Sequence, residues 1–162
     1  MPRVFVGVGS NINRDYHIKA GIKALEAVFE EIQCSPIYDT EAVGFKGDNF
    51  LNLVVSFQSL LSPKEIDAHL SAIEDTYQRV RSTNTKFCSR TLDLDLLMVG
   101  SEALQSENLN LPRQDVYHCA YVLKPLLDLD SELRDPVSGR LFSEIWQSLS
   151  ADQKSEIQAL VP

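Results

Sequence analysis

Apolar and polar residues follow strand and helix periods in turn along the first 100 positions. Short apolar runs bounded by turn residues favour strands, and apolar residues spaced three or four apart favour amphipathic helices. We expect, in order, a buried strand at 4–9, a helix at about 15–31, strands at 32–40 and 50–59, a second helix after position 62, and a strand that ends at position 99.

Both predicted helices have support beyond their periodicity. The first has an apolar face that consists of Ile18, Ile22, Leu25, Phe29 and Ile32. The second begins at Ser62-Pro63-Lys64-Glu65, where Ser is a favoured N-cap, Pro suits the first turn and Glu completes a capping box. Its buried stripe is expected to contain Ile66, Leu70, Ile73 and Tyr77.

The order β-α-β-β-α-β predicts an α+β fold of the ferredoxin-like type, an antiparallel sheet with both helices on one face. From Ser101 onward we expect a C-terminal extension, with an extended segment at 108–112, short helices from Asp115 and a turn at 135–139. No repeat or linker interrupts the chain. We therefore expect a single domain over residues 1–162, with a core at about 3–100 and an appended segment at about 101–162.

The strongest chemical signal is a pair of acids that follows a group of cations. Asp93 and Asp95 alternate with leucines at 92, 94 and 96, so a strand would place both carboxylates on one face and the leucines on the other. The preceding segment has four cations and no acid; they are Arg79, Arg81, Lys86 and Arg90. Paired carboxylates suit Mg²⁺, and arginines suit phosphates.

A plainer interpretation of this segment is a half-buried strand with an acidic, solvated face beside an ordinary basic loop. For the Asp-x-Asp pattern alone the plainer interpretation is favoured. The adjoining cations favour metal-dependent phosphoryl chemistry instead. Neither a Gly-x-x-x-x-Gly-Lys-Ser/Thr loop nor a complete dinucleotide fingerprint is present, so phosphates would be held by metal and side chains.

Composition narrows the class of protein. The 162 residues carry a formal net charge of −8, which argues against general binding of nucleic acid or anionic membranes. Cys34, Cys88 and Cys119 are widely spaced and match neither a disulfide framework nor a zinc motif. The first apolar run is too short for a signal peptide, and no stretch reaches membrane-spanning length. We expect a cytoplasmic protein that acts on small molecules.

The chain resembles the 6-hydroxymethyl-7,8-dihydropterin pyrophosphokinase family over about residues 3–135. The most specific match is Arg90-Thr91-Leu92-Asp93-Leu94-Asp95. The other matching segments are Gly9-Ser10-Asn11, Tyr38-Asp39-Thr40 with Val43-Gly44, Phe50-Leu51-Asn52, Ile73-Glu74, Arg79-Val80-Arg81 and Val122-Leu123-Lys124-Pro125-Leu126.

The resemblance implies transfer of a pyrophosphoryl group from ATP to the hydroxymethyl group of the pterin, with release of AMP. Asp93 and Asp95 would hold two Mg²⁺ ions, and Arg79 and Arg90 would contact the phosphates as catalytic residues. Further ATP contacts are expected from Glu74, Arg81, Lys86 and Arg113. The pterin pocket is expected to contain Thr40, Val43, Phe50, Asn52 and Tyr121, with the two aromatic rings enclosing the heterocycle. The expected partners are ATP and a pterin alcohol, and we expect a monomer.

The chain departs from the usual family pattern mainly around the nucleotide. The unusual residues are Ser71, Gln78, Phe87, Cys88, Ser89, Asn108, Arg113 and Cys119. Two alternatives therefore stay open. The first is a paralogue with a different nucleotide or heterocyclic alcohol as substrate. The second is a binding module that holds pterin or nucleotide without turnover.

Overall fold

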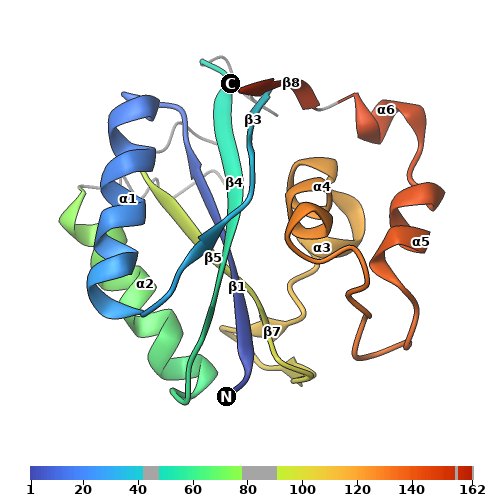
Figure 1. Ribbon diagram of the computed structural model, residues 1–162, viewed down its shortest axis with the longest axis horizontal. Coiled ribbons are helices and arrows are strands. Elements are labelled where there is room, and N and C mark those ends of the chain that lie inside the picture. The colour runs from blue at the N-terminus through green and yellow to red at the C-terminus, as the bar shows by residue number, and fades with distance from the viewer. Residues whose placement is uncertain (42–47, 78–90, 156, 162) are drawn as a thin grey trace.

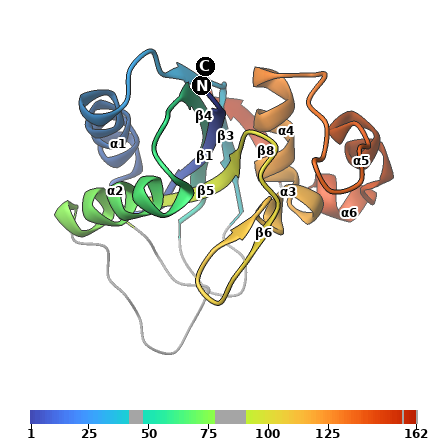
Figure 2. The same cartoon turned by 90° about the horizontal axis from the view of Figure 1, so that it is seen from below.

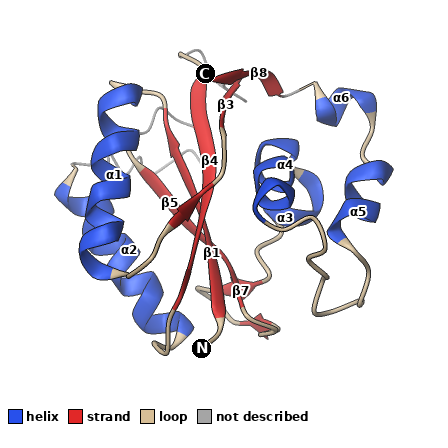
Figure 3. Cartoon of the chain, in the orientation of Figure 1, coloured by secondary structure: helices blue, strands red, loops and turns tan. Residues whose placement is uncertain are grey.

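The computed structural model describes residues 1–41, 48–77, 91–155 and 157–161. Its main sheet contains β1 (Arg3–Ser10), β2 (Gln33–Cys34), β3 (Ile37–Thr40), β4 (Phe50–Gln58), β5 (Asp93–Val99) and β8 (Ile157–Val161). The strand order is β5-β1-β4-β3-β8, β2 also pairs with β4, and every pairing is antiparallel. The predicted α+β class with an antiparallel sheet is confirmed (Figure 3).

Two helices cover one face of this sheet, as predicted. They are α1 (Arg14–Val28) and α2 (Pro63–Thr76), and both lie on the same side of the strands in Figure 1. Ile18 and Leu25 of α1 and Ile66 and Leu70 of α2 pack against inward-facing strand residues in one apolar cluster. The Ser62 hydroxyl accepts a hydrogen bond from the Glu65 amide at 3.2 Å, which confirms the predicted capping box.

The C-terminal segment covers the opposite face of the sheet, which the sequence did not predict. It contains the small hairpin β6 (Leu104–Gln105) and β7 (Asn110–Leu111), followed by α3 (Asp115–His118), α4 (Ala120–Leu129), α5 (Phe142–Ser148) and α6 (Ala151–Lys154). Leu123, Leu126 and Phe142 pack against Val54 and Leu97 from the sheet in a second apolar cluster. Figure 2 shows the sheet between the two layers of helices. The prediction that the helices lie on one face of the sheet therefore holds for α1 and α2 only, because the C-terminal helices cover the other face.

Two further differences concern the edge of the sheet at β3. The predicted strand 32–40 is divided, because Pro36 has no N–H to donate and the Ser35 hydroxyl accepts from the Val54 amide at 2.9 Å. Beyond β3, β8 extends the sheet by one strand near the C-terminus, a pairing absent from the prediction. The pairing of β8 with β3 places residues 157–161 along this edge (Figure 1).

The alternation in β5 is as predicted. Leu92, Leu94 and Leu96 are buried in the cluster beneath α1 and α2. Asp93 and Asp95 point to the other face and remain half-exposed. Among the described residues, no helix has the length and apolar character needed to cross a membrane.

Candidate functional site

Asp93 belongs to a row of paired residues that crosses the sheet, and Asp95 lies two residues further along β5 on the same face. Asp93 in β5 pairs with Gly9 in β1, and Gly9 pairs with Asn52 in β4. Asn52 in turn pairs with Tyr38 in β3. Side chains at paired positions share a face of a sheet. The acidic strand and the polar end of β4 therefore face the same side, on either side of a glycine.

The Asn52 amide fits closely over that glycine. A Cβ atom at position 9 would lie 2.7 Å from Asn52 Oδ1, nearer than real Cβ contacts. On its other side the amide donates from Nδ2 to the Thr40 hydroxyl at 2.6 Å. Thr40 is buried, and Phe50, which pairs with it, is half-buried. The predicted residues Thr40, Asn52 and Phe50 therefore lie together, with the orientation of the amide fixed.

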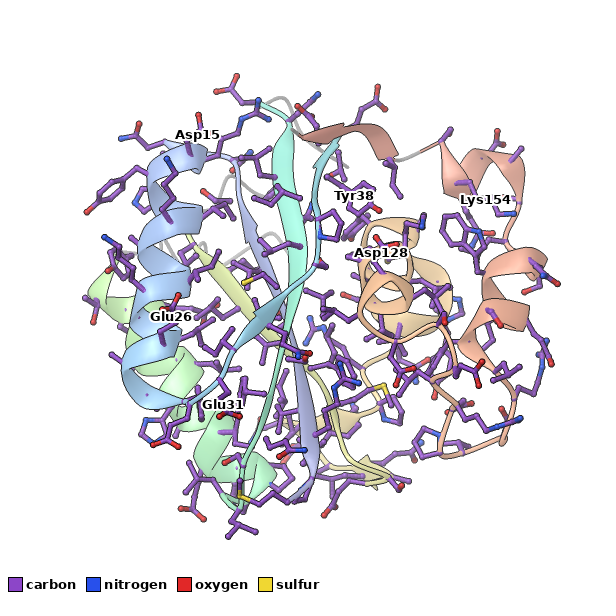
Figure 4. All side chains as sticks on the ribbon, viewed as in Figure 1. Asp15, Glu26, Glu31, Tyr38, Asp128 and Lys154 are labelled. Carbon is purple, nitrogen blue, oxygen red and sulfur yellow. The ribbon has the colours of Figure 1, made fainter. Side chains whose placement is uncertain are left out.

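Helix α4 adjoins the same strands. The Tyr38 hydroxyl donates to the Asp128 carboxylate, which also accepts from Lys124 Nζ at 2.8 Å. The side chains of Tyr38 and Asp128 point toward one another in Figure 4. Burial, with a further contribution from Asp128, raises the pKa of Tyr38, so the hydroxyl keeps its proton. Tyr121 lies in the first turn of α4, half-buried beside the second apolar cluster.

Asp95, two residues from Asp93 in β5, is in an unfavourable electrostatic setting. Burial raises the pKa of Asp95, and the nearby carboxylate of Asp93 raises it further. Asp115 and Glu74 add to the shift, while Arg113 opposes it. A group of acids with little compensating charge attracts a cation.

Arg113 is a cation in direct contact with Asp95 and Asp115. Its Nη2 lies 3.6 Å from Asp95 Oδ1, and its Nε donates to Asp115 Oδ2 at 3.2 Å. The Arg113 backbone amide donates to the Leu97 carbonyl at 2.9 Å, which fixes the residue alongside β5. The predicted ATP contact Arg113 therefore lies at the predicted metal ligands.

Glu74, also predicted as an ATP contact, is 4 % exposed in α2. Its Oε2 accepts a hydrogen bond from the Leu94 amide at 2.9 Å. The carboxylate thus holds the backbone of β5 between the two aspartates. This placement makes Glu74 a residue that positions the acidic strand.

The carboxylate oxygens of Asp93 and Asp95 suit Mg²⁺, which also takes ligands from water and phosphate, better than a metal ion whose ligands all come from the protein. The described residues contain no group of three or more acidic, histidine or cysteine side chains able to hold a metal. Two neighbouring carboxylates nevertheless suffice for Mg²⁺, which keeps several waters and shares phosphate oxygens with its substrate. Asp93 and Asp95 match that requirement.

Five of the predicted site residues lie outside the described residues. They are Val43, Arg79, Arg81, Lys86 and Arg90. Their predicted roles stay predictions. Of the unusual family positions, Cys119 is half-exposed and lies at the junction of α3 and α4.

The sequence interpretation missed a set of hydrogen bonds that holds the chain near Thr40 and Phe50. Arg14 Nη1 donates to Asp39 Oδ2 at 3.2 Å and to the Asn49 carbonyl at 3.1 Å. Asn11 Nδ2 donates to the Asp48 carbonyl at 3.1 Å. The turn after β1 therefore holds the chain that leads into β4. A polar Asn-x-Asn-Arg sequence directly after a buried strand is the signal that could have indicated it.

Comparison with known proteins gives a consistent family. Residues 5–131 match the model of a protein family described as 7,8-dihydro-6-hydroxymethylpterin-pyrophosphokinase (HPPK). A 2-amino-4-hydroxy-6-hydroxymethyldihydropteridine pyrophosphokinase of Haemophilus influenzae is 30% identical over 158 residues, 95% of this chain and 96% of that protein. A Pseudomonas aeruginosa protein of the same name is 35% identical over 147 residues, 88% of this chain and 89% of its own length.

Solved structures give the same fold. The Plasmodium falciparum HPPK-DHPS structure with SDX-DHP matches with a TM-score of 0.69 at 13% identity over 91% of this chain. The match spans 43% of that longer protein. A second Plasmodium falciparum HPPK-DHPS structure, with pterin and p-hydroxybenzoate, has a TM-score of 0.71.

Proposed function

This chain belongs to the 7,8-dihydro-6-hydroxymethylpterin-pyrophosphokinase family, and we propose that it performs the reaction for which the family is named. The hydroxymethyl oxygen of 6-hydroxymethyl-7,8-dihydropterin bonds to the β-phosphorus of ATP. The bond from that phosphorus to the oxygen bridging toward the α-phosphorus breaks. AMP leaves with the bridging oxygen, and the hydroxyl proton is released.

One observation carries this proposal: the row Asp93–Gly9–Asn52 across three adjacent strands. It joins Asp93, which shares a face of β5 with Asp95, to an oriented amide; the two acids suit a metal–nucleotide complex, and the amide suits the edge of a flat heterocycle. An acceptor alcohol held by the amide therefore lies beside phosphates held at the acids. Such positioning is the main contribution that a protein makes to phosphoryl transfer.

On the nucleotide side, Asp93 and Asp95 hold two Mg²⁺ ions in this proposal. The bound ions would neutralise phosphate charge and orient the β-phosphorus for attack. Glu74 keeps the β5 backbone in register beneath the two carboxylates. Arg79, Arg90, Arg81, Lys86 and Arg113 complete the phosphate contacts as cations, and the first two stabilise the charge that develops during transfer.

On the pterin side, Asn52 and Thr40 read the donors and acceptors of the ring. Because Asn52 Nδ2 is already bonded to Thr40, its Oδ1 is directed away from that hydroxyl and accepts from the heterocycle. Phe50 and Tyr121 enclose the ring between their faces, and Val43 contributes an apolar wall.

The fold supports a single domain that consists of a core and an extension. The core strand order β5-β1-β4-β3 with α1 and α2 on one face supports a ferredoxin-like core at about 3–100. The segment at about 101–162 is an extension of one domain, since it shares an apolar cluster with the sheet. We propose a monomer whose partners are ATP and the pterin alcohol.

Replacement of Asp95 tests this assignment. We expect Asp95→Ala to abolish Mg²⁺-dependent release of AMP while the protein stays folded by circular dichroism. Asp130→Ala is the matched control, because Asp130 forms a 3.2 Å ion pair with Arg3 and lies outside the site. Retained turnover in Asp95→Ala would contradict the metal role of β5.

A second candidate, a related enzyme with another nucleotide, is favoured by one observation. Arg113 introduces a fixed cation beside Asp95 and Asp115. Turnover rates measured with a panel of nucleoside triphosphates, at a fixed pterin concentration, distinguish these two candidate functions. A preference for a nucleotide other than ATP would favour the second candidate.

A further inference from the structure

We propose that Arg113 and the divalent cation compete for Asp95, so that Arg113 holds this carboxylate in the nucleotide-free protein and transfers to phosphate when the metal–nucleotide complex binds. The inference rests on the proposed function, because it takes Asp95 as a metal ligand. It adds a role for Arg113 that acts before any phosphate is present.

The geometry divides the Arg113 guanidinium into a fixed end and an exchangeable end. Nε donates a hydrogen bond to Asp115 Oδ2 at 3.2 Å, within ordinary hydrogen-bond range. Nη2 lies 3.6 Å from Asp95 Oδ1, which is an ion pair beyond that range. The contact to Asp115 is therefore the anchor, and the contact to Asp95 is the one that yields.

The backbone restricts how far Arg113 can move. Its amide donates to the Leu97 carbonyl at 2.9 Å, and its carbonyl accepts from the Val116 amide at 3.1 Å. Main-chain bonds on both sides keep the Cα beside β5. A change of partner at Nη2 is consequently a pivot of the whole planar guanidinium about the hydrogen bond that Nε donates to Asp115.

The surrounding charges explain why a cation occupies this place before the metal arrives. Burial lowers the pKa of Arg113, but the carboxylates of Asp95 and Asp93 in β5 and of Asp115 at the start of α3 raise it more. Burial raises the pKa of Asp67 in α2, and the positive charge of the Arg113 guanidinium opposes that rise. One guanidinium thus compensates acids from three elements.

A metal ion at Asp95 would neutralise the carboxylate charge that attracts the Arg113 guanidinium. Asp95 would hold a divalent cation through its carboxylate oxygens, which would place charge of the same sign close to Nη2. Repulsion drives the exchangeable end away from Asp95. Phosphate oxygens that share the ion are the nearest acceptors for its donors, and guanidinium binds them through two parallel hydrogen bonds.

Competition predicts opposite effects on metal and on nucleotide when the charge of Arg113 is removed. Arg113→Gln should bind metal more tightly without nucleotide, because no cation has to be displaced. It should bind ATP more weakly, because a phosphate contact is lost. A residue that only stabilised the fold would not change the two affinities in opposite directions.

The test measures Mn²⁺ binding to the nucleotide-free protein by electron paramagnetic resonance, with Mn²⁺ as a spectroscopic stand-in for Mg²⁺. We expect Arg113→Gln to lower the dissociation constant for Mn²⁺ by about tenfold and to raise the KM for ATP more than it lowers kcat. Arg113→Lys, which keeps the charge, should bind Mn²⁺ like the wild type. It also serves if the glutamine variant fails to fold.

Arg140→Gln is the matched control, because Arg140 forms a 3.7 Å surface pair with Glu144 and should leave Mn²⁺ affinity unchanged. An Mn²⁺ affinity that is unchanged or lower in Arg113→Gln, or no binding in either protein, would overturn the competition. Asp95→Asn tests the premise separately: wild-type Mn²⁺ affinity in that variant would contradict the proposed metal site itself.

Discussion

The side-chain amide of Asn52 lies directly over Gly9, with its Oδ1 2.7 Å from where a Cβ atom would stand at that position. The glycine is therefore required by the neighbouring side chain on β4. The same amide donates to Thr40 at 2.6 Å, so space at position 9 and orientation of the amide are linked.

Replacement of Gly9 should consequently affect pterin binding more than folding. In Gly9→Ala the new methyl group would displace the Asn52 amide and disrupt its hydrogen bond to Thr40. We expect the KM for the pterin to rise about tenfold, the effect of one disrupted polar contact. Gly7→Ala is the control on the same strand and face, since its Cβ would meet only Leu97 side-chain carbons at 3.7 Å or more. An equal effect of both changes on the KM would contradict this explanation.

Asp95 should cost stability in the absence of metal. Burial and Asp93 raise its pKa above the unfolded value of about 4. The folded protein then holds the proton more strongly than the unfolded chain does. That stabilisation is complete below about pH 4 and is lost as the pH rises through the raised folded value.

Asp95→Asn removes the ionisable carboxyl group, and with it the loss of stability as the pH rises. In metal-free buffer at pH 8 we expect the variant to melt about 3 °C above the wild type, which corresponds to about 1 kcal/mol for a domain of this size. The difference should shrink toward pH 4. Added Mg²⁺ should raise the Tm of the wild type but not of the variant. Thermal unfolding across this pH range checks the sign, and a lower Tm for the variant at pH 8 would refute it.

Glu74 should link stability to turnover through the β5 backbone. Glu74→Ala leaves the buried Leu94 amide without its carboxylate acceptor, a loss of about 1–3 kcal/mol in the free energy of unfolding. It also frees the strand that carries both aspartates, so kcat should fall. Glu65→Ala on the same helix removes an exposed capping contact instead, while the Ser62 cap remains, and should cost less stability than Glu74→Ala without a change in kcat. Urea unfolding and steady-state kinetics on both variants decide the matter, and an unchanged kcat in Glu74→Ala would argue against a positioning role.

Arg14 should act on the pterin through the segment that it holds. Arg14→Ala removes the contacts to Asp39 and to the Asn49 carbonyl, next to Thr40 and Phe50. We expect a KM for the pterin at least about fivefold higher, with little change in the KM for ATP. Arg3→Ala breaks an ion pair of the same 3.2 Å length at the other end of β1 and should change neither constant. Equal behaviour of the two variants would assign Arg14 to general stability.

The parts of the fold that the sequence predicted depend on local patterns. Alternation places Asp93 and Asp95 on one face whatever lies opposite, and the capping box at Ser62 needs only four consecutive residues. The position of the C-terminal helices on the second face follows instead from an apolar cluster of residues distant in sequence, which includes Val54 and Leu123. No local pattern in the short β8 indicates its pairing with β3.

The same distinction applies to the candidate site. Thr40, Asn52 and Phe50 come together because β3 and β4 pair directly. The bond from Arg14 to Asp39 joins residues 25 positions apart, and the contact of Arg113 with Asp95 depends on the turn after β7 that returns the chain to β5. Both contacts require the tertiary fold, so residue type and spacing alone could not predict them.

The central claim is the transfer of a pyrophosphoryl group from ATP to a pterin alcohol. The most direct measurement is the release of AMP from ATP and Mg²⁺, with and without 6-hydroxymethyl-7,8-dihydropterin. We expect AMP to form only when the pterin is present, in amounts equal to the diphosphorylated pterin. Folded protein that binds the pterin but releases no AMP would contradict the proposed function.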